Sequence, residues 1–416
     1  MSITSTNVWN NIAMITSRAL EGVHNNTQMG RRVARRWDGD FKGSGRIGDT
    51  LSIRKPPVFA TRTGPVAQPN AYVDGYTQVQ LNQVGVDVEL TSRELALNVD
   101  DFAANVMDNL VLALVQRYDN DIIKATSCAT SVDGRGFNQF AGAVGTAITT
   151  MGPFLQAKAF AETQSAAPMD DRVSAMFNPF VAANTILGQT GYFHPDDVIS
   201  ENYKSGALGD LAGLKVFTTT NTPSLVMGTW SGTITYTSGA TDGGNTMTLA
   251  GMTGTFAPGE HFTVLGVQAV NPQGFAVQPE LKEFEVVSQT GAVVTFFPSM
   301  NLTGTFQNVS ALPVSGAAIY PWGSGNATAA AASAVAAGTG QTVRRSLVFH
   351  EDALALCMAD LDDISGFSKR MQDPKTGLRI RSSIWWDGVN DKKIFRLESL
   401  YGAATLREGF GADVIQ

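Results

Sequence analysis

Residues 251–287 read GMTGTFAPGEHFTVLGVQAVNPQGFAVQPELKEFEVV, and a Thr290-Gly291 turn leads from them into VVTFFP at 293–298. Short runs with apolar residues at alternate positions are separated by turns rich in Gly, Pro and Asn, which is the pattern of β-strands joined by tight connections. Similar runs occur at 233–237 and 246–249. The stretch 223–320 therefore predicts a small all-β barrel or sandwich.

The sequence on both sides of this stretch mixes helical and strand patterns. Apolar residues recur every fourth position through 100–124, which predicts one long helix with a single apolar stripe: Phe102, Val106, Leu110, Leu114, Tyr118 and Ile122. Shorter helices are predicted at 154–162 and 180–187, a buried strand at 173–177, and a C-terminal hairpin from 378–386 and 394–401. We interpret 223–320 as a domain inserted into an α+β host.

The N-terminal part predicts an arm and an extended hairpin. Residues 1–36 have near-helical apolar spacing, and a strand at 51–54 is followed by a connection, 55–75, that contains four prolines. A returning strand is expected at 79–90, with one phase slip around Gln83 that suggests a bulge. Because a structureless connection of about 20 residues is uncommon within a compact domain, we expect it to lie on a neighbouring subunit. The candidate contact residues are Pro56, Pro57, Arg62, Pro65, Pro69 and Tyr72.

Charge is unevenly distributed along a chain whose net charge is -7. Residues 1–62 hold ten Lys/Arg and four Asp/Glu, a net +6, whereas 223–320 hold one Lys and five Asp/Glu, a net -4. The basic cluster Arg31, Arg32, Arg35 and Arg36 has three interpretations: a solvated helix face, a contact with an acidic neighbour such as an assembly partner, or a contact with packaged DNA.

No catalytic, cofactor-binding or metal-ligating residues are predicted. Cys128 and Cys357 are far apart and lack neighbouring ligands, so both are expected to be reduced core residues. His350 precedes Glu351-Asp352 and is expected to cap a strand-to-helix turn rather than act in acid–base chemistry. The glycine-rich run at 43–48 lacks the flanking strand and helix that nucleotide binding requires. The longest apolar run within a helical pattern, 110–115, is too short for a membrane span, and no secretory signal is recognised.

The order of these features resembles the major capsid proteins of tailed bacteriophages, which share the fold named after phage Hong Kong ninety-seven. Within that group the chain is most similar to the coat proteins of the short-tailed Salmonella phages, which carry an inserted β-barrel domain. The resemblance is carried by the quoted stretch 251–298, with support from Met176-Phe177-Asn178-Pro179 and Leu400-Tyr401-Gly402.

This resemblance implies an N-terminal arm (1–47), an E-loop hairpin (48–91), a spine helix with the P-domain and part of the A-domain (92–222), the inserted barrel (223–320) and the remainder of the A- and P-domains (321–416). It implies a non-enzymatic subunit that forms pentamers and hexamers, assembles with a scaffolding protein and a portal in the host bacterial cytoplasm, and encloses double-stranded DNA in the virion. Some relatives join subunits through Lys–Asn isopeptide bonds. Since the loop has only Lys55, at its base, we expect a non-covalent shell.

Three alternatives remain open from the sequence. One is an encapsulin-like nanocompartment shell, although such shells resemble the version of the fold without an insertion. Another is a cytoplasmic enzyme with an inserted β-domain, which a clustered His/Asp/Glu pocket would favour. The third is a virion decoration or receptor-binding protein, which the long helix disfavours.

Overall fold

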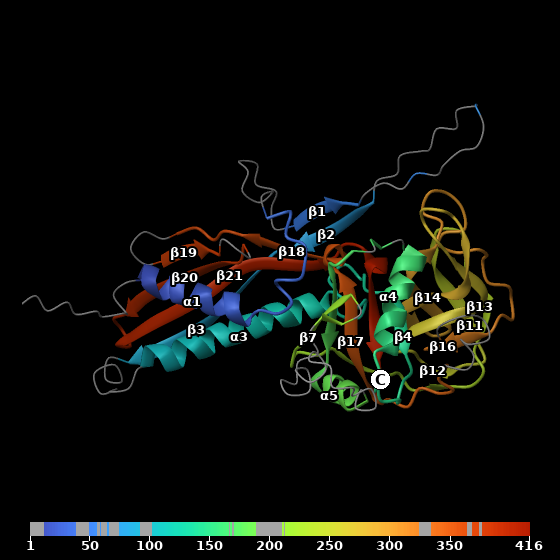
Figure 1. The fold of residues 1–416 in the computed structure, drawn as a ribbon, viewed down its shortest axis with the longest axis horizontal. Helices are drawn as coiled ribbons and strands as arrows, with labels where there is room; N and C mark the ends of the chain where they lie inside the picture. Colours follow the sequence, from blue (N-terminus) through green and yellow to red (C-terminus); the bar gives the residue numbers. More distant parts are fainter. Residues whose placement is uncertain are drawn as a thin grey trace, which may run out of the picture. The chain divides into compact units, whose positions relative to one another are not determined.

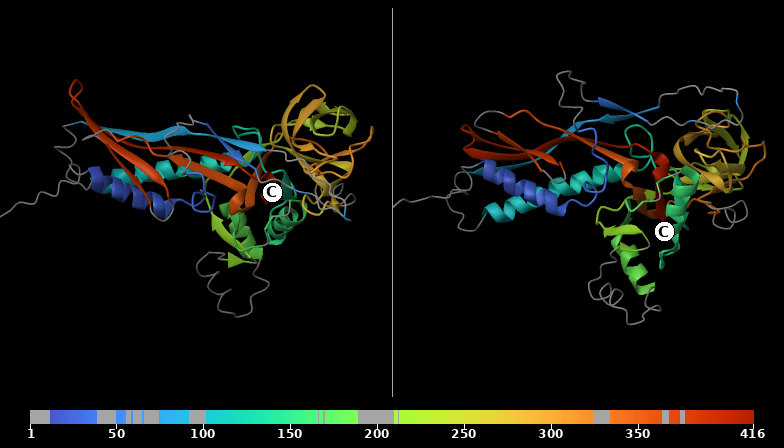
Figure 2. Two further views of the ribbon diagram at one scale, coloured as in Figure 1. Left: turned by 90° about the horizontal axis from the view of Figure 1, so that it is seen from above. Right: turned by 45° about the horizontal axis from the view of Figure 1, so that its top comes forward.

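The computed structural model describes residues 12–38, 50–55, 59, 65, 75–91, 102–165, 167–168, 170–188, 210–211, 213–323, 334–363, 368–373 and 377–416 (Figures 1 and 2). The chain forms two compact units. Unit 1 comprises Met1–Ser52, Gln78–Ile122 and Ala355–Ala404, and unit 2 comprises Ile53–Thr77, Ile123–Leu354 and Thr405–Gln416. Helices and sheets occur in both units, so the predicted α+β class is confirmed.

Unit 1 is built on a five-stranded sheet in which strands distant in sequence are neighbours. Its order is β18-β21-β20-β19, and β3 also pairs with β21, from Lys392↔Thr91 to Tyr401↔Asn82. The strands are β3 (Asn82–Thr91), β18 (Leu354–Ala359), β19 (Ser368–Gln372), β20 (Arg379–Asp387) and β21 (Lys392–Thr405). The predicted C-terminal hairpin is confirmed, because β20 and β21 pair antiparallel from Arg381↔Glu398 to Asp387↔Lys392.

Two helices, α1 (Ile12–Asn26) and α3 (Phe102–Lys124), pack on one face of this sheet (Figure 1). The hydroxyls of Thr16 and Ser382 are hydrogen-bonded, and the rings of Tyr118 and Tyr401 meet edge to face with centroids 4.7 Å apart. The helices also touch each other at Gly22, where a Cβ would lie 2.9 Å from Val111 Cγ1. The long helix is confirmed, and four members of its predicted stripe are buried: Leu110, Leu114, Tyr118 and Ile122.

A short hairpin, β1 (Thr50–Arg54) with β2 (Tyr76–Gln80), carries the base of the predicted loop. The Lys55 N–H donates to the Gly75 carbonyl at 2.7 Å and closes that base. The single returning strand predicted at 79–90 is wrong: the chain breaks at Leu81, so that β2 pairs with β1 whereas β3 pairs with β21. Leu81 is itself buried, which fixes the break between the two pairings.

Unit 2 contains a seven-stranded mixed sheet with the order β4-β22-β17-β5-β7-β6 and β8 added to β17. Its strands are β4 (Gln139–Gly142), β5 (Val173–Phe177), β6 (Asp210–Leu211), β7 (Leu214–Thr218), β8 (Ser224–Val226), β17 (Thr342–His350) and β22 (Gly411–Ile415). Helices α4 (Gly152–Ser165) and α5 (Pro179–Gly188) confirm the two shorter helix predictions. Phe154 of α4 stacks on Phe177 of β5 with centroids 4.0 Å apart, in the core between helix and sheet.

The β-rich stretch after β8 forms a six-stranded antiparallel sheet, ordered β10-β11-β15-β14-β13-β16. The strands are β10 (Thr235–Ser238), β11 (Gly244–Ala250), β13 (His261–Val270), β14 (Val277–Thr290), β15 (Val293–Met300) and β16 (Ile319–Pro321). The Tyr236 N–H donates to Ala317 at 2.9 Å and the Ile319 N–H to Ile234 at 3.0 Å. These bonds join the first strand to the last, so the sheet closes around an aromatic core with Phe262, Phe284 and Phe296.

Candidate functional site: a buried charged junction and a basic segment

The closed sheet meets the seven-stranded sheet through charged as well as apolar side chains, since Phe140, Val343 and Ile415 share its hydrophobic core. Along β14, Phe284 and Val286 belong to the core of the closed sheet, so the alternate residues Glu283 and Glu285 face the other way. On the neighbouring strand His261 lies opposite Glu285, and Thr263 lies opposite Glu283. The four polar residues are all fully buried. We call them, with the groups that they contact, the junction.

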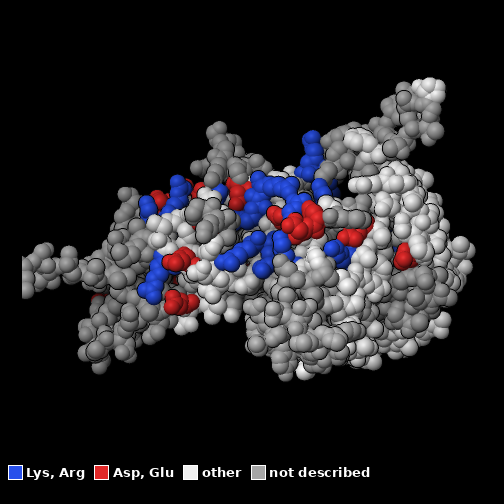
Figure 3. Space-filling model, viewed as in Figure 1, with Lys and Arg blue, Asp and Glu red and all other residues white. Residues whose placement is uncertain are grey.

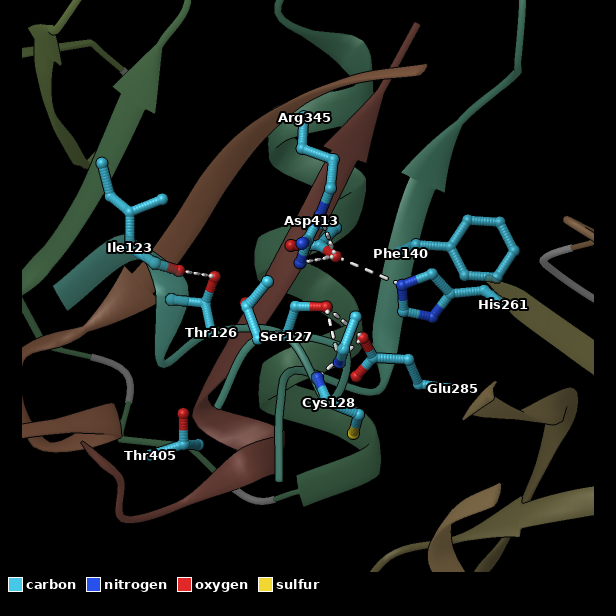
Figure 4. A network of polar contacts seen from close by, with 12 residues as sticks. Ile123, Thr126, Ser127, Cys128, Phe140, His261, Glu285, Arg345, Thr405 and Asp413 are labelled. Atoms are coloured by element: carbon cyan, nitrogen blue, oxygen red, sulfur yellow. Dashed lines mark hydrogen bonds and ion pairs between the residues drawn. The ribbon is translucent and has the colours of Figure 1, made fainter. Parts of the chain in front are cut away.

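The host side of the junction supplies hydrogen-bond donors from the turn after α3 and from β4 (Figure 4). The Ser127 hydroxyl and the Cys128 N–H donate to Glu285 Oε1 at 2.7 and 3.0 Å. The Phe140 N–H donates to Glu283 Oε2 at 3.0 Å. Each glutamate is therefore held by neutral donors.

Asp413, on β22 between β4 and β17, is the third carboxylate of the junction. Arg345 on β17 donates to its Oδ2 from both Nε, at 2.8 Å, and Nη2. His261 Nε2 lies 3.2 Å from the same oxygen, which places this side chain of β13 directly on the host sheet (Figure 4). Arg345 and Asp413 expose 4% and 0% of their side chains, so this ion pair is fully desolvated.

The junction leaves several polar atoms unsatisfied. Among the described residues, Glu283 Oε1, Glu285 Oε2, Asp413 Oδ1 and His261 Nδ1 are buried without a hydrogen-bond partner. Burial raises the pKa of Glu283 to about 8, although the Phe140 N–H and the nearby Lys282 charge oppose the rise. Burial likewise raises the pKa of Glu285. The protonated forms of both carboxyls are therefore favoured relative to a glutamate in water.

The residue types at the junction are those of nucleophilic catalysis, but their environment is not. The Ser127 hydroxyl donates to a carboxylate, and burial raises the pKa of the Cys128 thiol, so neither side chain is activated. The cluster is covered on all sides, with Glu285, His261 and Asp413 each 0% exposed. A substrate would have no access to these groups. Within the described residues, no three His, Cys, Asp or Glu side chains are arranged to hold a metal ion.

The base of the β1–β2 hairpin is fixed by a second, partly exposed charge contact. Lys55 Nζ lies 2.7 Å from Glu408 Oε2, with 18% and 27% of the side chains exposed. Arg135 Nη1 donates to the Thr77 hydroxyl at 3.4 Å on the adjoining strand. The only lysine of the predicted loop is thus engaged within unit 2. Of the other candidate loop residues, Pro65 is exposed, while Pro56, Pro57, Arg62, Pro69 and Tyr72 lie outside the described residues.

The basic cluster lies after α1, not on it. The prediction of a largely helical arm over residues 1–36 is confirmed for α1 but not for the basic cluster. The helix ends at Asn26, and Asp119 of α3 accepts the N–H groups of Gln28 and Met29 at 3.1 and 3.0 Å. Ala34 then forms a parallel bridge with Ala355. The first interpretation of the basic cluster, a solvated helix face, therefore does not apply, because the cluster is not on a helix.

The four arginines have different environments. Arg35 is held inside unit 1, where it donates to Asp38 and to the Gly377 carbonyl, both at 2.8 Å. Arg32 donates to the Gln28 carbonyl at 2.7 Å and is half-buried, whereas Arg31 and Arg36 are exposed. Figure 3 shows basic and acidic side chains interspersed on the visible face, so the cluster does not extend there into one large basic patch.

Other single-residue predictions can be placed directly. His350 caps the short helix η4 (Glu351–Ala353), since its Nδ1 accepts the Asp352 N–H at 3.1 Å, as predicted. Cys128 and Cys357 are buried free thiols, which is also confirmed. The glycine run at 43–48 lies outside the described residues. No helix among the described residues is sufficiently long and apolar to span a bilayer.

Sequence reasoning missed the junction, although one signal was available. In ELKEFEVV, residues 280–287, charged side chains stand on both faces of a strand that the pattern predicts to be buried. Buried charges need partners, so a second element covering β14 could have been expected. No local sequence pattern predicts the roles of Asp413 and Glu408, because their partners Arg345 and Lys55 are 68 and 353 residues away in the chain.

Comparisons with known proteins found similarity in structure but not in sequence. No family model matches the chain, and no curated protein matches it. A structure of Mycobacterium phage Che8 is 10% identical and covers 93% of this chain and 90% of its own, with a TM-score of 0.47. The capsid of Ralstonia phage GP4 is 10% identical and covers 89% and 83%, with a TM-score of 0.42. The CUS-3 coat protein I-domain is 20% identical and covers 22% of this chain and 96% of its own length, with a TM-score of 0.19. TM-scores below 0.5 do not by themselves establish a common fold.

Proposed function

We propose that this chain is the major capsid protein of a tailed bacteriophage, a subunit that builds an icosahedral shell around double-stranded DNA without catalysis. The observation that carries the proposal is the order of elements along one chain. An N-terminal helix, a hairpin, a long helix on a sheet, an α/β sheet and a closed β-sheet follow one another, and the C-terminal strands return to both large sheets. This order is the one that the resemblance in the sequence implies.

The described residues also suit a protein that works through surfaces. The junction, which has residue types found in catalysis, is sealed, and its charges join two sheets. Exposed apolar side chains instead occur on helix α5, at the end of β20 and in the turn after it: Phe180, Leu187, Trp386 and Val389, which are 62%, 65%, 64% and 92% exposed. Such side chains favour contacts between subunits.

The finer features remain part of the proposal. The subunits would form pentamers and hexamers with a scaffolding protein and a portal, in the cytoplasm of the bacterial host, before the DNA is packaged. The closed β-sheet would be the inserted domain of the short-tailed Salmonella phage coat proteins. Arg31 and Arg36, the exposed members of the basic cluster, are the better candidates for contacts with an acidic scaffold segment or with DNA phosphates.

Electron microscopy of the purified full-length chain, alone and with its genomic neighbours, tests the proposal. Closed shells or rings of five and six subunits are expected. A chain that remains monomeric under all these conditions would contradict the proposal. Shells that form in the cell around a specific protein, and that never take up DNA, would favour the encapsulin-like alternative.

The hairpin loop gives the sharper test. Deleting residues 57–71 should leave a folded monomer that forms no shells, because the loop is proposed to lie on a neighbouring subunit while its base is closed by Lys55 and Gly75. A control replaces the same fifteen residues with a Gly/Ser linker of equal length, which keeps the closure and removes the contacts; it should also fail to assemble. Normal shells from either variant would show that the loop is not a required contact.

A further inference from the structure

The junction holds more negative groups than positive ones. Three carboxylates, Glu283, Glu285 and Asp413, converge where Arg345 is the only permanent cation among the groups bonded to them, and Arg345 is used by Asp413. Glu285 receives the Ser127 hydroxyl, the Cys128 N–H and the Cys128 thiol, and Glu283 receives the Phe140 N–H, so neither is bonded to a cation. An ionised carboxylate without a cation is costly in a dry interface. A proton on one of the glutamates removes that cost.

We propose that the junction is a proton-coupled clasp: the closed sheet takes up at least one proton from solvent, on Glu283 or Glu285, when it closes on the seven-stranded sheet. The clasp therefore holds more tightly in mild acid and opens more readily as the pH rises. The inference does not depend on the proposed function, because it concerns contacts within one chain.

The groups packed around the two glutamates together set how readily each glutamate is protonated. Around Glu283 lie the Phe140 N–H of β4, Asn138, whose side chain donates to the Glu283 carbonyl, Thr263 of β13, and Lys282 and Glu280 of its own strand. Around Glu285 lie Ser127, Cys128, His261, Arg345 and Asp413. The glutamate carboxyl also lies close to the backbone: a Cβ at Gly136 would be 2.5 Å from Glu285 Oε2. This leaves little room for water to solvate a charge.

The sign of the pH dependence of closure follows from the pKa of each group in the open and in the closed junction. Glu283 has an ordinary pKa of 4.5 when exposed, and burial raises it to about 8 in the closed state. Closure is therefore strongest below about pH 4.5 and weakens as the pH rises towards about 8. Lys282 acts with the opposite sign, because burial lowers its pKa from 10.5 to about 8, and its contribution begins only above that pH. The window from pH 6 to 8 lies below the range in which Lys282 contributes most, and the glutamine variants identify the group that takes up the proton.

The two buried thiols of the full-length chain provide the measurement. Cys128 is part of the junction and 5% exposed, whereas Cys357 is 0% exposed in unit 1. The rate at which a small maleimide labels each thiol, divided by its rate in the denatured chain at the same pH, gives an opening constant free of the thiol's own ionisation. Uptake of one proton predicts a rise of about tenfold for Cys128 from pH 6 to 7 and about 50-fold from pH 6 to 8, because the dependence levels off near the closed-state pKa of about 8. Cys357 reports any opening that is not specific to the junction.

Glutamine substitutions identify which carboxyl takes up the proton. E283Q or E285Q should flatten the dependence at Cys128, whereas E280Q, on the same strand but only half-buried, should retain it. An opening constant of Cys128 that is flat or falls from pH 6 to 8 would overturn the proposal, as would a full slope in both junction variants. If the glutamine variants do not fold, the slope of the unaltered protein decides alone.

Discussion

The outer face of the unit 1 sheet and the junction of unit 2 are built from the same kinds of charged side chain in opposite surroundings. In unit 1, Arg396 lies 2.7 Å from Asp87, with 38% and 52% of the side chains exposed, and Lys392 lies 2.8 Å from Glu89. In unit 2, Arg345 and Asp413 make an equally close pair that is almost wholly buried. The distance between the charges therefore does not predict how much each ion pair contributes to stability. Exposure does, because it sets the desolvation cost of each charge.

Both sets of charges arise from strand alternation. In unit 1, the residues that alternate with the core positions of β21 face away from α1 and α3, and they pair across the sheet with Asp87 and Glu89 of β3. In unit 2, Glu283 and Glu285 also alternate with core positions, but another sheet covers them. The same period of two therefore gives a solvated surface in one unit and a sealed interface in the other.

The largest expected effect is at Arg345. Arg345→Met leaves Asp413 buried without its cation, and the free energy of unfolding should fall by about 3–5 kcal/mol. Chemical denaturation followed by fluorescence measures this. Arg396→Met in unit 1 is the matched control and should cost about 1 kcal/mol or less. Equal losses in the two variants would contradict the role given to burial.

A buried charge in unit 1 tests whether a large loss in the free energy of unfolding comes from burial or from the unit in which the charge lies. Asp119 is 3% exposed and accepts two backbone N–H groups that follow α1. Asp119→Ala leaves these donors unsatisfied, so we expect a loss of about 1–3 kcal/mol in the free energy of unfolding. Asp108→Ala, at an exposed position of the same helix, should change it by about 0.5 kcal/mol or less. A negligible effect at Asp119 would show that the unit, and not burial, governs the cost.

The smallest effect is expected at the exposed pair. Asp87→Asn should lower the free energy of unfolding by about 0.2–1 kcal/mol in dilute buffer. The loss should disappear in about 1 M salt, where the Debye length falls to about 3 Å. A loss that is the same at both salt concentrations would mean that Asp87 acts through packing or hydrogen bonding and not through its charge.

Local patterns predicted the elements well where one period dominates. The four-residue spacing from Leu110 to Ile122 specifies one buried helix face, and α3 follows it. His350 was assigned as a cap from its position before two acidic residues, and it makes that bond. Predictions failed where a distant partner decides. The helix of the N-terminal arm stops at Asn26, where Asp119 supplies acceptors that compete with further helical bonds.

The sequence by itself determined the α+β class, the long helix, the short strands of the β-rich stretch and the burial of both cysteines, because each depends on neighbours within a few residues. Only the tertiary structure decided that β2 and β3 pair with different partners, that Arg35 is bonded within unit 1, and that His261 and Asp413 meet across 152 residues. These contacts depend on which surfaces cover one another. A side chain's identity shows that it needs a partner, whereas only the folded chain selects which partner it has.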